Sequence, residues 1–273
     1  MSRSPPIPAP FLRLTMASLC FPVRLPGPRN DWQRARAKRA DVGSEIVEVK
    51  PGRYAVKALN DVSISLLAGD RLAIIGGNGA GKTTVLKALA GIYDLESGSR
   101  EVSGKISTIF NMRLGFEMGQ SGYDNILLRG LIESQPKAKI LATIQEIADF
   151  SGLGDYLYMP LDTYSAGMLA RLAFSIATAW DASILLLDEW IGAGDIGFFK
   201  MAEDRLVNFV TQVQILVVAS HNPQILRRFC NRAIVMSHGA IGYEGGVDDA
   251  WKWFQEHQQA HFADHAGATR LGA

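Results

Sequence analysis

The sequence is poor in three features, and each shortage removes a class of protein. Only two cysteines, Cys20 and Cys230, occur in 273 residues, so a disulfide framework is excluded and a reducing compartment fits. No run of about 18 uninterrupted apolar residues occurs, so no segment is predicted to span a bilayer alone. The formal net charge is +1, which provides no basic field for neutralising many phosphates, so we expect no nucleic-acid partner.

The composition, 48% hydrophobic and 20% charged, is typical of a soluble globular chain with one core and a small appended subdomain. Residues 1–13 are proline-rich and are therefore predicted to be unstructured. The prolines and Arg13 also interrupt any apolar segment of a secretion signal, so no such signal is expected. A first strand is expected over Thr15–Val23, before a Pro/Arg-rich insert over Leu25–Arg39. The basic residues at 34–39 favour a solvated charge run over contact with anionic lipid headgroups.

From residue 58 to about Trp253, short apolar runs alternate with helical patterns. We expect strands at Ala58–Leu66, Arg71–Ile75, Ile184–Leu187, Gln214–Ala219 and Ala233–Met236, and helices at Lys82–Ile92, Pro136–Phe150, Met168–Trp180 and Ala202–Val210. This alternation favours an α/β fold, a parallel sheet with helices on both faces. Helical spacing predicts two buried stripes: Ile140, Ile144 and Ile147 on one helix, and Leu169, Leu172, Ile176 and Trp180 on another.

A glycine-rich loop stands between an apolar strand and a helix start. The stretch from Gly76 to Thr83 fits the phosphate-binding pattern G-x-x-x-x-G-K-[ST] in the context that this pattern requires. Glycines let backbone N–H groups curl around a polyphosphate without Cβ obstruction. Lys82 is predicted to reach the β- and γ-phosphates, and Thr83 to place its hydroxyl on Mg²⁺. The predicted nucleotide-binding residues are Gly76, Gly77, Asn78, Gly79, Ala80, Gly81, Lys82, Thr83 and Thr84.

The loop alone does not separate a kinase, a GTPase and a transport ATPase, but the run "ILLLDEW" favours a hydrolase. An apolar strand ends there with Asp188 and Glu189, and parallel sheets place their ligand sites at such ends. Asp188 is predicted to hold Mg²⁺, and Glu189 to orient or deprotonate the attacking water. The alternative interpretation is a solvated Asp-Glu pair.

A second candidate anion site is the turn Ser165-Ala166-Gly167, which precedes a strongly helical run. One phosphate chain does not need two such sites in one subunit. The loop, this turn, Asp188 with Glu189, and His221 in "VVASHN" stand in an order and spacing that resemble an ABC transporter nucleotide-binding subunit over about residues 55–255.

The resemblance implies how these residues act together. Two copies would pair head to tail, so that Ser165 and Gly167 of one copy bind the γ-phosphate held by Lys82 and the loop of the other. His221 would be a catalytic switch residue that contacts the γ-phosphate and the catalytic water; its alternative role is to cap a helix. Asp195 would link the two nucleotide sites; its alternative is a turn residue.

Two positions stay open within the resemblance. Phe21 and Tyr54 are both candidates for the aromatic that stacks on adenine. Family members carry a glutamine that touches Mg²⁺ and the membrane partner, and Asn111 stands at the corresponding place here, with Gln120 further along. We therefore expect Asn111 as a metal-contacting residue and keep Gln120 as the alternative.

The runs "YSAGM", "RLAFSIAT", "DEWIGAGD" and "GYDNILLRG" are similar to the family branch that exports lipid-linked polysaccharides such as O-antigen, capsule and teichoic acid. This resemblance implies an ATPase that uses ATP and Mg²⁺, forms a homodimer, and serves an integral membrane ABC-2-type permease at the cytoplasmic face of the bacterial inner membrane. A C-terminal carbohydrate-reading domain is not expected. The alternatives are a drug or lipid exporter, or a soluble, non-transport ABC ATPase.

On this resemblance the fold is a P-loop NTPase of the ABC type, with a mostly parallel sheet flanked by helices, a β subdomain and a small helical subdomain. The expected domains are 1–45 (tail, first strand and basic insert), 46–255 (ATPase domain, with its helical subdomain at about 117–180) and 256–273 (C-terminal tail). The histidines of that tail, His257, His261 and His265, favour a polar tail over a metal site.

Overall fold

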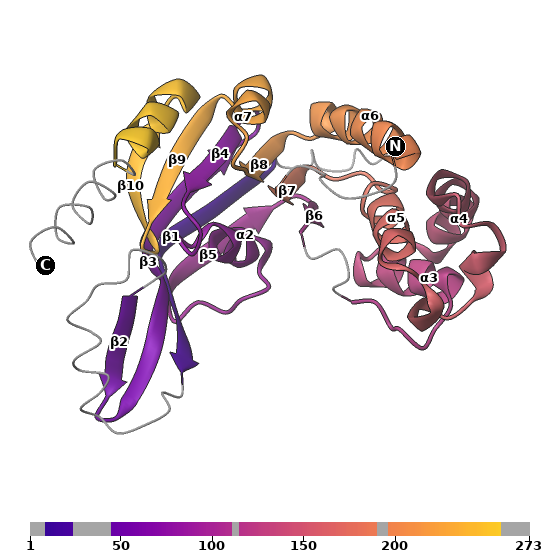
Figure 1. The fold of residues 1–273 in the computed structure, drawn as a ribbon, viewed down its shortest axis with the longest axis horizontal. Coiled ribbons are helices and arrows are strands. Elements are labelled where there is room, and N and C mark those ends of the chain that lie inside the picture. Colours follow the sequence, from indigo (N-terminus) through magenta and orange to yellow (C-terminus); the bar gives the residue numbers. More distant parts are fainter. Residues whose placement is uncertain (1–8, 24–44, 111–114, 190–195, 258–273) are drawn as a thin grey trace, which may run out of the picture. The chain divides into compact units, whose positions relative to one another are not determined.

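The computed structural model describes residues 9–23, 45–110, 115–189 and 196–257. The chain divides into two units: Met1–Gly104 together with Gln214–Ala273 form the first, and Lys105–Val213 form the second. Figure 1 labels the helices and strands of both units. The predicted basic insert and all but the first residues of the C-terminal tail lie outside the described residues.

The first unit is built on two sets of strands. The strands of the first set are β1 (Phe11–Val23), β2 (Glu45–Lys50), β3 (Arg53–Leu67) and β5 (Ser97–Ser103), and those of the second are β4 (Arg71–Gly76), β8 (Ile215–Ala219), β9 (Arg232–Ser237) and β10 (Ala240–Gly245). The first set is an antiparallel sheet in the order β2-β3-β1-β5. In the second set β4 pairs in parallel with both β8 and β9, which confirms the expected parallel sheet. β10 adds an antiparallel strand beside β9.

The helices of the first unit are α2 (Lys82–Ala90), α7 (Pro223–Phe229) and a helical segment at 247–257. A tight turn joins β3 to β4, and in it the Asp70 N–H donates to the Leu67 carbonyl at 2.9 Å. The Asp70 carboxylate in turn accepts from the Leu67 N–H at 2.8 Å. This turn fixes the direction in which β4 enters the sheet.

The prediction that residues 1–13 are unstructured is wrong at its end, because β1 already begins at Phe11. Leu12 and Leu14 are buried and lie opposite Leu66 and Ile64 of β3. Alternating apolar residues that bury one face of a strand outweigh the prolines before them. The partner strand lies about 50 residues away in sequence, so the residue at which β1 begins depends on a contact that the local sequence does not show.

The second unit holds a parallel pair of strands and a group of helices. Its strands are β6 (Ile106–Ile109) and β7 (Ile184–Asp188), and its α-helices are α3 (Gly122–Ile132), α4 (Lys137–Ser151), α5 (Ala166–Ala177) and α6 (Ile196–Gln212). Two short 3₁₀ helices are η1 (Gly154–Tyr158) and η2 (Leu161–Thr163). β6 and β7 pair in parallel. The expected helical subdomain at about 117–180 falls inside this unit, and its boundaries stay a prediction.

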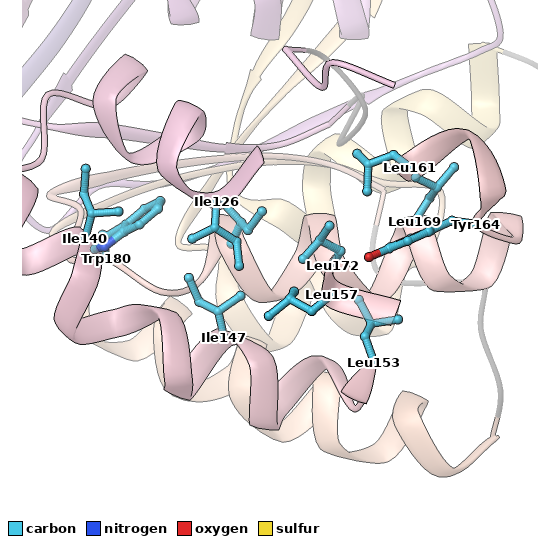
Figure 2. Packing of buried hydrophobic residues seen from close by; sticks show 11 residues of the cluster. Ile126, Ile140, Ile147, Leu153, Leu157, Leu161, Tyr164, Leu169, Leu172 and Trp180 are labelled. Carbon is cyan, nitrogen blue, oxygen red and sulfur yellow. The ribbon is translucent and has the colours of Figure 1, made fainter. Parts of the chain in front are cut away.

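Both predicted apolar stripes are buried in one cluster of the second unit, shown in Figure 2. The stripe of α4 contributes Ile140 and Ile147, with Ile144 packed at the margin, and α5 with the residues after it contributes Leu169, Leu172, Ile176 and Trp180. Ile126 of α3 completes the contact between the three helices. Ser121 begins α3 as a capping residue, since its Oγ accepts from the Asp124 N–H at 3.1 Å.

Candidate functional site

The glycine-rich loop connects β4 to α2 in the first unit, as the sequence predicts. β4 is buried from Leu72 to Ile75 and ends at Gly76, and α2 begins at Lys82 after Gly81. Within the described residues no side chain caps the N-terminus of α2, whose first hydrogen bond joins the Val85 N–H to the Gly81 carbonyl at 2.9 Å. The N–H groups of the first helical turn therefore face the loop, an arrangement that binds anions.

Both end glycines of the loop are required by the space around them. A Cβ on Gly76 would lie 2.6 Å from the backbone oxygen of Met236 in β9. Gly81 has a φ of 104°, and a Cβ there would lie 3.0 Å from the backbone oxygen of Ala58 in β3. Side chains at these positions would push the loop off its supports. The loop is thus a cradle formed by backbone, with Asn78 exposed at its tip.

Lys82 reaches back into this loop from the first residue of α2. Its ammonium is largely buried and donates to the carbonyl oxygens of Gly76 at 2.8 Å and Gly77 at 2.9 Å. Phosphate oxygens are acceptors of the same kind with more negative charge, so they would compete well for these N–H groups. A backbone cradle with a lysine ammonium directed into it fits a nucleotide polyphosphate.

His221 follows the buried strand β8 and lies beside Lys82. Its Nε2 is 3.3 Å from the Lys82 ammonium. A lysine ammonium has only donors, so in a hydrogen bond between these two groups Nε2 would be the acceptor. The helix-capping alternative for His221 is wrong, because the cap of α7 is Asn222, whose Oδ1 accepts from the Gln224 N–H at 2.9 Å.

The two candidate adenine-stacking aromatics lie on neighbouring strands of the first unit. Phe21 of β1 faces Val56 of β3, and Tyr54 faces Val23, so Phe21 and Tyr54 are diagonal neighbours on one face of the sheet. Phe21 also meets Tyr93 edge-on, with ring centroids 5.2 Å apart. Both candidates are half-buried, and the choice between them stays open.

Asp188 and Glu189 stand at the end of β7 in the second unit, where the sequence predicts them. Leu185, Leu186 and Leu187 before them are fully buried, whereas Asp188 is half-buried and Glu189 is exposed. Glu189 has a φ of 64°, in the left-handed region that residues with a Cβ seldom adopt. Such strained backbone is concentrated at functional sites, and here it coincides with the exposed carboxylate residue that the sequence predicts as the base.

The turn Ser165-Ala166-Gly167 opens α5 and is exposed throughout. Ser165 is the N-cap, and its Oγ accepts from the Met168 N–H at 3.2 Å. Tyr164 anchors the turn: its buried ring belongs to the core cluster, and its hydroxyl donates to the Tyr156 carbonyl. Burial raises the pKa of Tyr164, so this donor keeps its proton.

Three further positions are predicted from the sequence as site residues: Asn111, its alternative Gln120, and Asp195. Asn111 and Asp195 lie outside the described residues, so their roles stay predictions. Gln120, the alternative to Asn111, sits exposed in a turn before α3, and its carbonyl accepts from the Leu161 N–H at 3.0 Å. The support that Met236 gives to the loop was not predicted, since a backbone carbonyl leaves no signal in the sequence.

Neither a membrane-spanning helix nor a metal-binding cluster occurs in the described residues. In 9–23, 45–110, 115–189 and 196–257, no helix is both long and apolar enough to cross a membrane. The same parts of the chain hold no group of three or more His, Cys, Asp or Glu side chains placed to bind a metal ion.

Comparison with known proteins places this site in a family context. Residues 59–192 match the family model described as ABC transporter. The O-antigen export system ATP-binding protein RfbE of Yersinia enterocolitica is 38% identical over 215 residues, which cover 79% of this chain and 90% of that protein. The corresponding RfbB protein of Myxococcus xanthus is 34% identical over 201 residues, 74% of this chain and 46% of that protein. The teichoic acids export ATP-binding protein TagH of Levilactobacillus brevis is 32% identical over 199 residues, 73% and 55% of the two chains.

Solved structures share the fold. An ATP-binding subunit of an ABC transporter matches with a TM-score of 0.64 at 16% identity, covering 90% of this chain and 93% of that one. The ATP-binding cassette MJ0796, solved as a dimer in a post-hydrolysis state with ADP and Pi, matches with a TM-score of 0.59 at 17% identity, covering 86% and 98%. At such identities the likeness concerns the fold alone.

Proposed function

Because the chain belongs to the ABC transporter family of ATP-binding subunits, we propose that it hydrolyses ATP to power a bacterial exporter of lipid-linked polysaccharide. The observation that carries this proposal is the 38% identity to an O-antigen export ATP-binding protein over 90% of that protein. The backbone cradle that holds the Lys82 ammonium supports the ATPase part, since it suits a polyphosphate.

Each residue of the site has a separate role in the proposed reaction. The loop N–H groups and Lys82 bind the phosphates, and Lys82 exchanges its carbonyl acceptors for phosphate oxygens. Thr83 and Asp188 would hold Mg²⁺, which would neutralise charge on the γ-phosphoryl group that passes from ATP to water. In the proposed mechanism Glu189 accepts the proton of the attacking water, and His221 contacts that water and the γ-phosphate.

Two copies of the chain would complete each nucleotide site. Gly167 lies in the first turn of a helix without a positive φ, and a Cβ there would meet only the Ser165 Oγ, at 3.8 Å. The absence of a side chain at Gly167 leaves its backbone open to a close approach from a second copy. The exposed Ser165 hydroxyl and Gly167 backbone then contact the γ-phosphate of the partner.

The assembly that we propose is a homodimer held by an integral membrane ABC-2-type permease at the cytoplasmic face of the inner membrane. ATP would favour the closed dimer, and hydrolysis would reopen it and move the permease. If the cargo is a polysaccharide, deleting the gene in its host should remove the surface polymer and leave lipid-linked polymer inside the cell. Unchanged surface polysaccharide would contradict the proposed cargo.

The ATPase role is tested by Glu189→Gln, which keeps the size of the side chain and removes its basicity. We expect phosphate release to fall at least about a hundredfold, while the ATP-bound dimer, followed by light scattering, lives longer. Glu101→Gln, at an exposed site on β5, is the matched control and should keep its turnover. Turnover of Glu189→Gln within about twofold of the unaltered chain would remove Glu189 from the role of base.

A further inference from the structure

The back of the glycine-rich loop rests on the turn between β9 and β10, within the first unit. The Gly239 N–H in this turn donates to the carbonyl of Ala80 at 3.0 Å. Ala80 is itself buried, and its own N–H donates to the Gly77 carbonyl at 3.3 Å. The segment just before α2 is therefore held from the turn on one side and from the loop on the other.

The same glycine is tied to a third segment. The Gly239 carbonyl accepts from the Asn60 N–H of β3 at 2.8 Å. Both backbone polar groups of Gly239 are thus used, one toward the loop and one toward β3. Because backbone hydrogen bonds of this kind are directional, the turn transmits the position of β3 to Ala80.

No side chain fits at position 239 without moving one of these segments. Gly239 has a φ of 78°, and a Cβ there would lie 2.7 Å from the Ala58 oxygen and 3.1 Å from the Lys57 oxygen. The same Ala58 oxygen lies 3.0 Å from where a Cβ of Gly81 would be. Backbone atoms of β3, the loop and the turn are in direct contact here, so a shift of the turn displaces the loop.

We propose that Gly239 is a positioning residue for nucleotide binding: it fixes Ala80 and Gly81, and through them the N–H groups that receive the phosphates. The inference rests on the ATP site proposed above. It predicts that a side chain at 239 weakens nucleotide binding through the loop, although Gly239 does not itself contact the nucleotide.

The chain offers a matched control for the backbone strain. Gly69, in the turn before β4, has a φ of 97°, and a Cβ there would meet nothing within 4 Å. It lies at the opposite end of β4 from the loop. Gly239→Ala and Gly69→Ala therefore share the cost of a positive φ, and only Gly239→Ala also collides with backbone beside the loop.

The test is the affinity of the full-length chain for the non-hydrolysable analogue AMP-PNP, by calorimetry, with a thermal melt without nucleotide for each variant. We expect both variants to melt at lower temperature, but only Gly239→Ala to raise the dissociation constant, by about tenfold or more. Binding of Gly239→Ala within about twofold of the unaltered chain, or an equal loss in Gly69→Ala, would overturn the role of Gly239. Failure of the unaltered chain to bind AMP-PNP would instead refute the proposed function.

Hydrogen exchange on the unaltered chain gives a second reading that needs no folded variant. If the turn and the loop move together, AMP-PNP should slow exchange of the amides at 238–241 and leave those at 68–70 unchanged. Equal exchange at 238–241 with and without AMP-PNP, in a chain that binds it, would overturn the inference.

Discussion

The left-handed backbone of Glu189 predicts that this residue, the proposed catalytic base, reduces the stability of the protein. Its φ of 64° costs a residue with a Cβ about 1–2 kcal/mol, whereas glycine adopts this region without that cost. Glycine also raises the conformational entropy of the unfolded chain, which lowers the free energy of unfolding by about 0.4–1 kcal/mol and offsets part of this gain. Taking the middle of each range, the net expectation is that Glu189→Gly is about 0.8 kcal/mol more stable than Glu189→Gln, which keeps the Cβ, within limits of about 0 and 1.6 kcal/mol.

Calorimetric melts without nucleotide measure this difference. For a chain of this size a change of 1 kcal/mol shifts the melting temperature by about 2–4 °C, so Glu189→Gly should melt about 1–4 °C above Glu189→Gln. Both variants should be inactive, since neither has a carboxylate at this position. A melting temperature of Glu189→Gly below that of Glu189→Gln would show that the backbone at 189 is not strained by its left-handed φ. The link between strain and function at this residue would then fail.

Two further predictions concern the two units and their thiols. Leu172→Ala, in the fully buried stripe of α5, should lower the free energy of unfolding by about 2–5 kcal/mol in urea titrations, whereas Leu131→Ala, 60% exposed on α3, should change it by less than about 0.5 kcal/mol. Equal urea midpoints for Leu172→Ala and Leu131→Ala would contradict the buried cluster that Figure 2 shows. Burial, with the neighbouring Glu96, raises the pKa of the Cys20 thiol to about 11, and burial raises that of Cys230 to about 12. Because the thiolate is the reacting form, iodoacetamide at pH 8 should label Cys20 about a hundredfold and Cys230 about a thousandfold more slowly in the native chain than in the unfolded one. Labelling should accelerate as the pH rises, and equal rates for native and urea-unfolded chain by mass spectrometry would contradict the burial.

The parts of the fold that local patterns encode are also those that the sequence predicts. The stripe of α5 follows helical spacing, and the loop from Gly76 to Thr83 follows a pattern whose glycines and lysine have separate physical reasons. The ends of β7 and β8 could be predicted as well, because their apolar runs stop at Asp188 and just before His221.

The parts that sequence reasoning missed depend on distant contacts. β5, with the sequence SGSREVS, has little apolar content because it is an edge strand paired only with β1 in its sheet. The early start of β1 depends on its pairing with β3. Gly239 contacts the loop through backbone atoms alone. A glycine in the sequence predicts a turn at this position, but it does not predict that the turn contacts the loop.

The central claim is that each nucleotide site combines Lys82 of one copy with Ser165 of the other, and mixing two inactive variants tests it most directly. Lys82→Ala and Ser165→Arg should each abolish ATP turnover in the complex with the permease. A dimer of one of each has one site with both residues intact, so complexes assembled from an equal mixture should regain up to about a quarter of the original turnover. If the mixture stays as inactive as its components, the two residues do not meet across a dimer and the account of a shared site is contradicted.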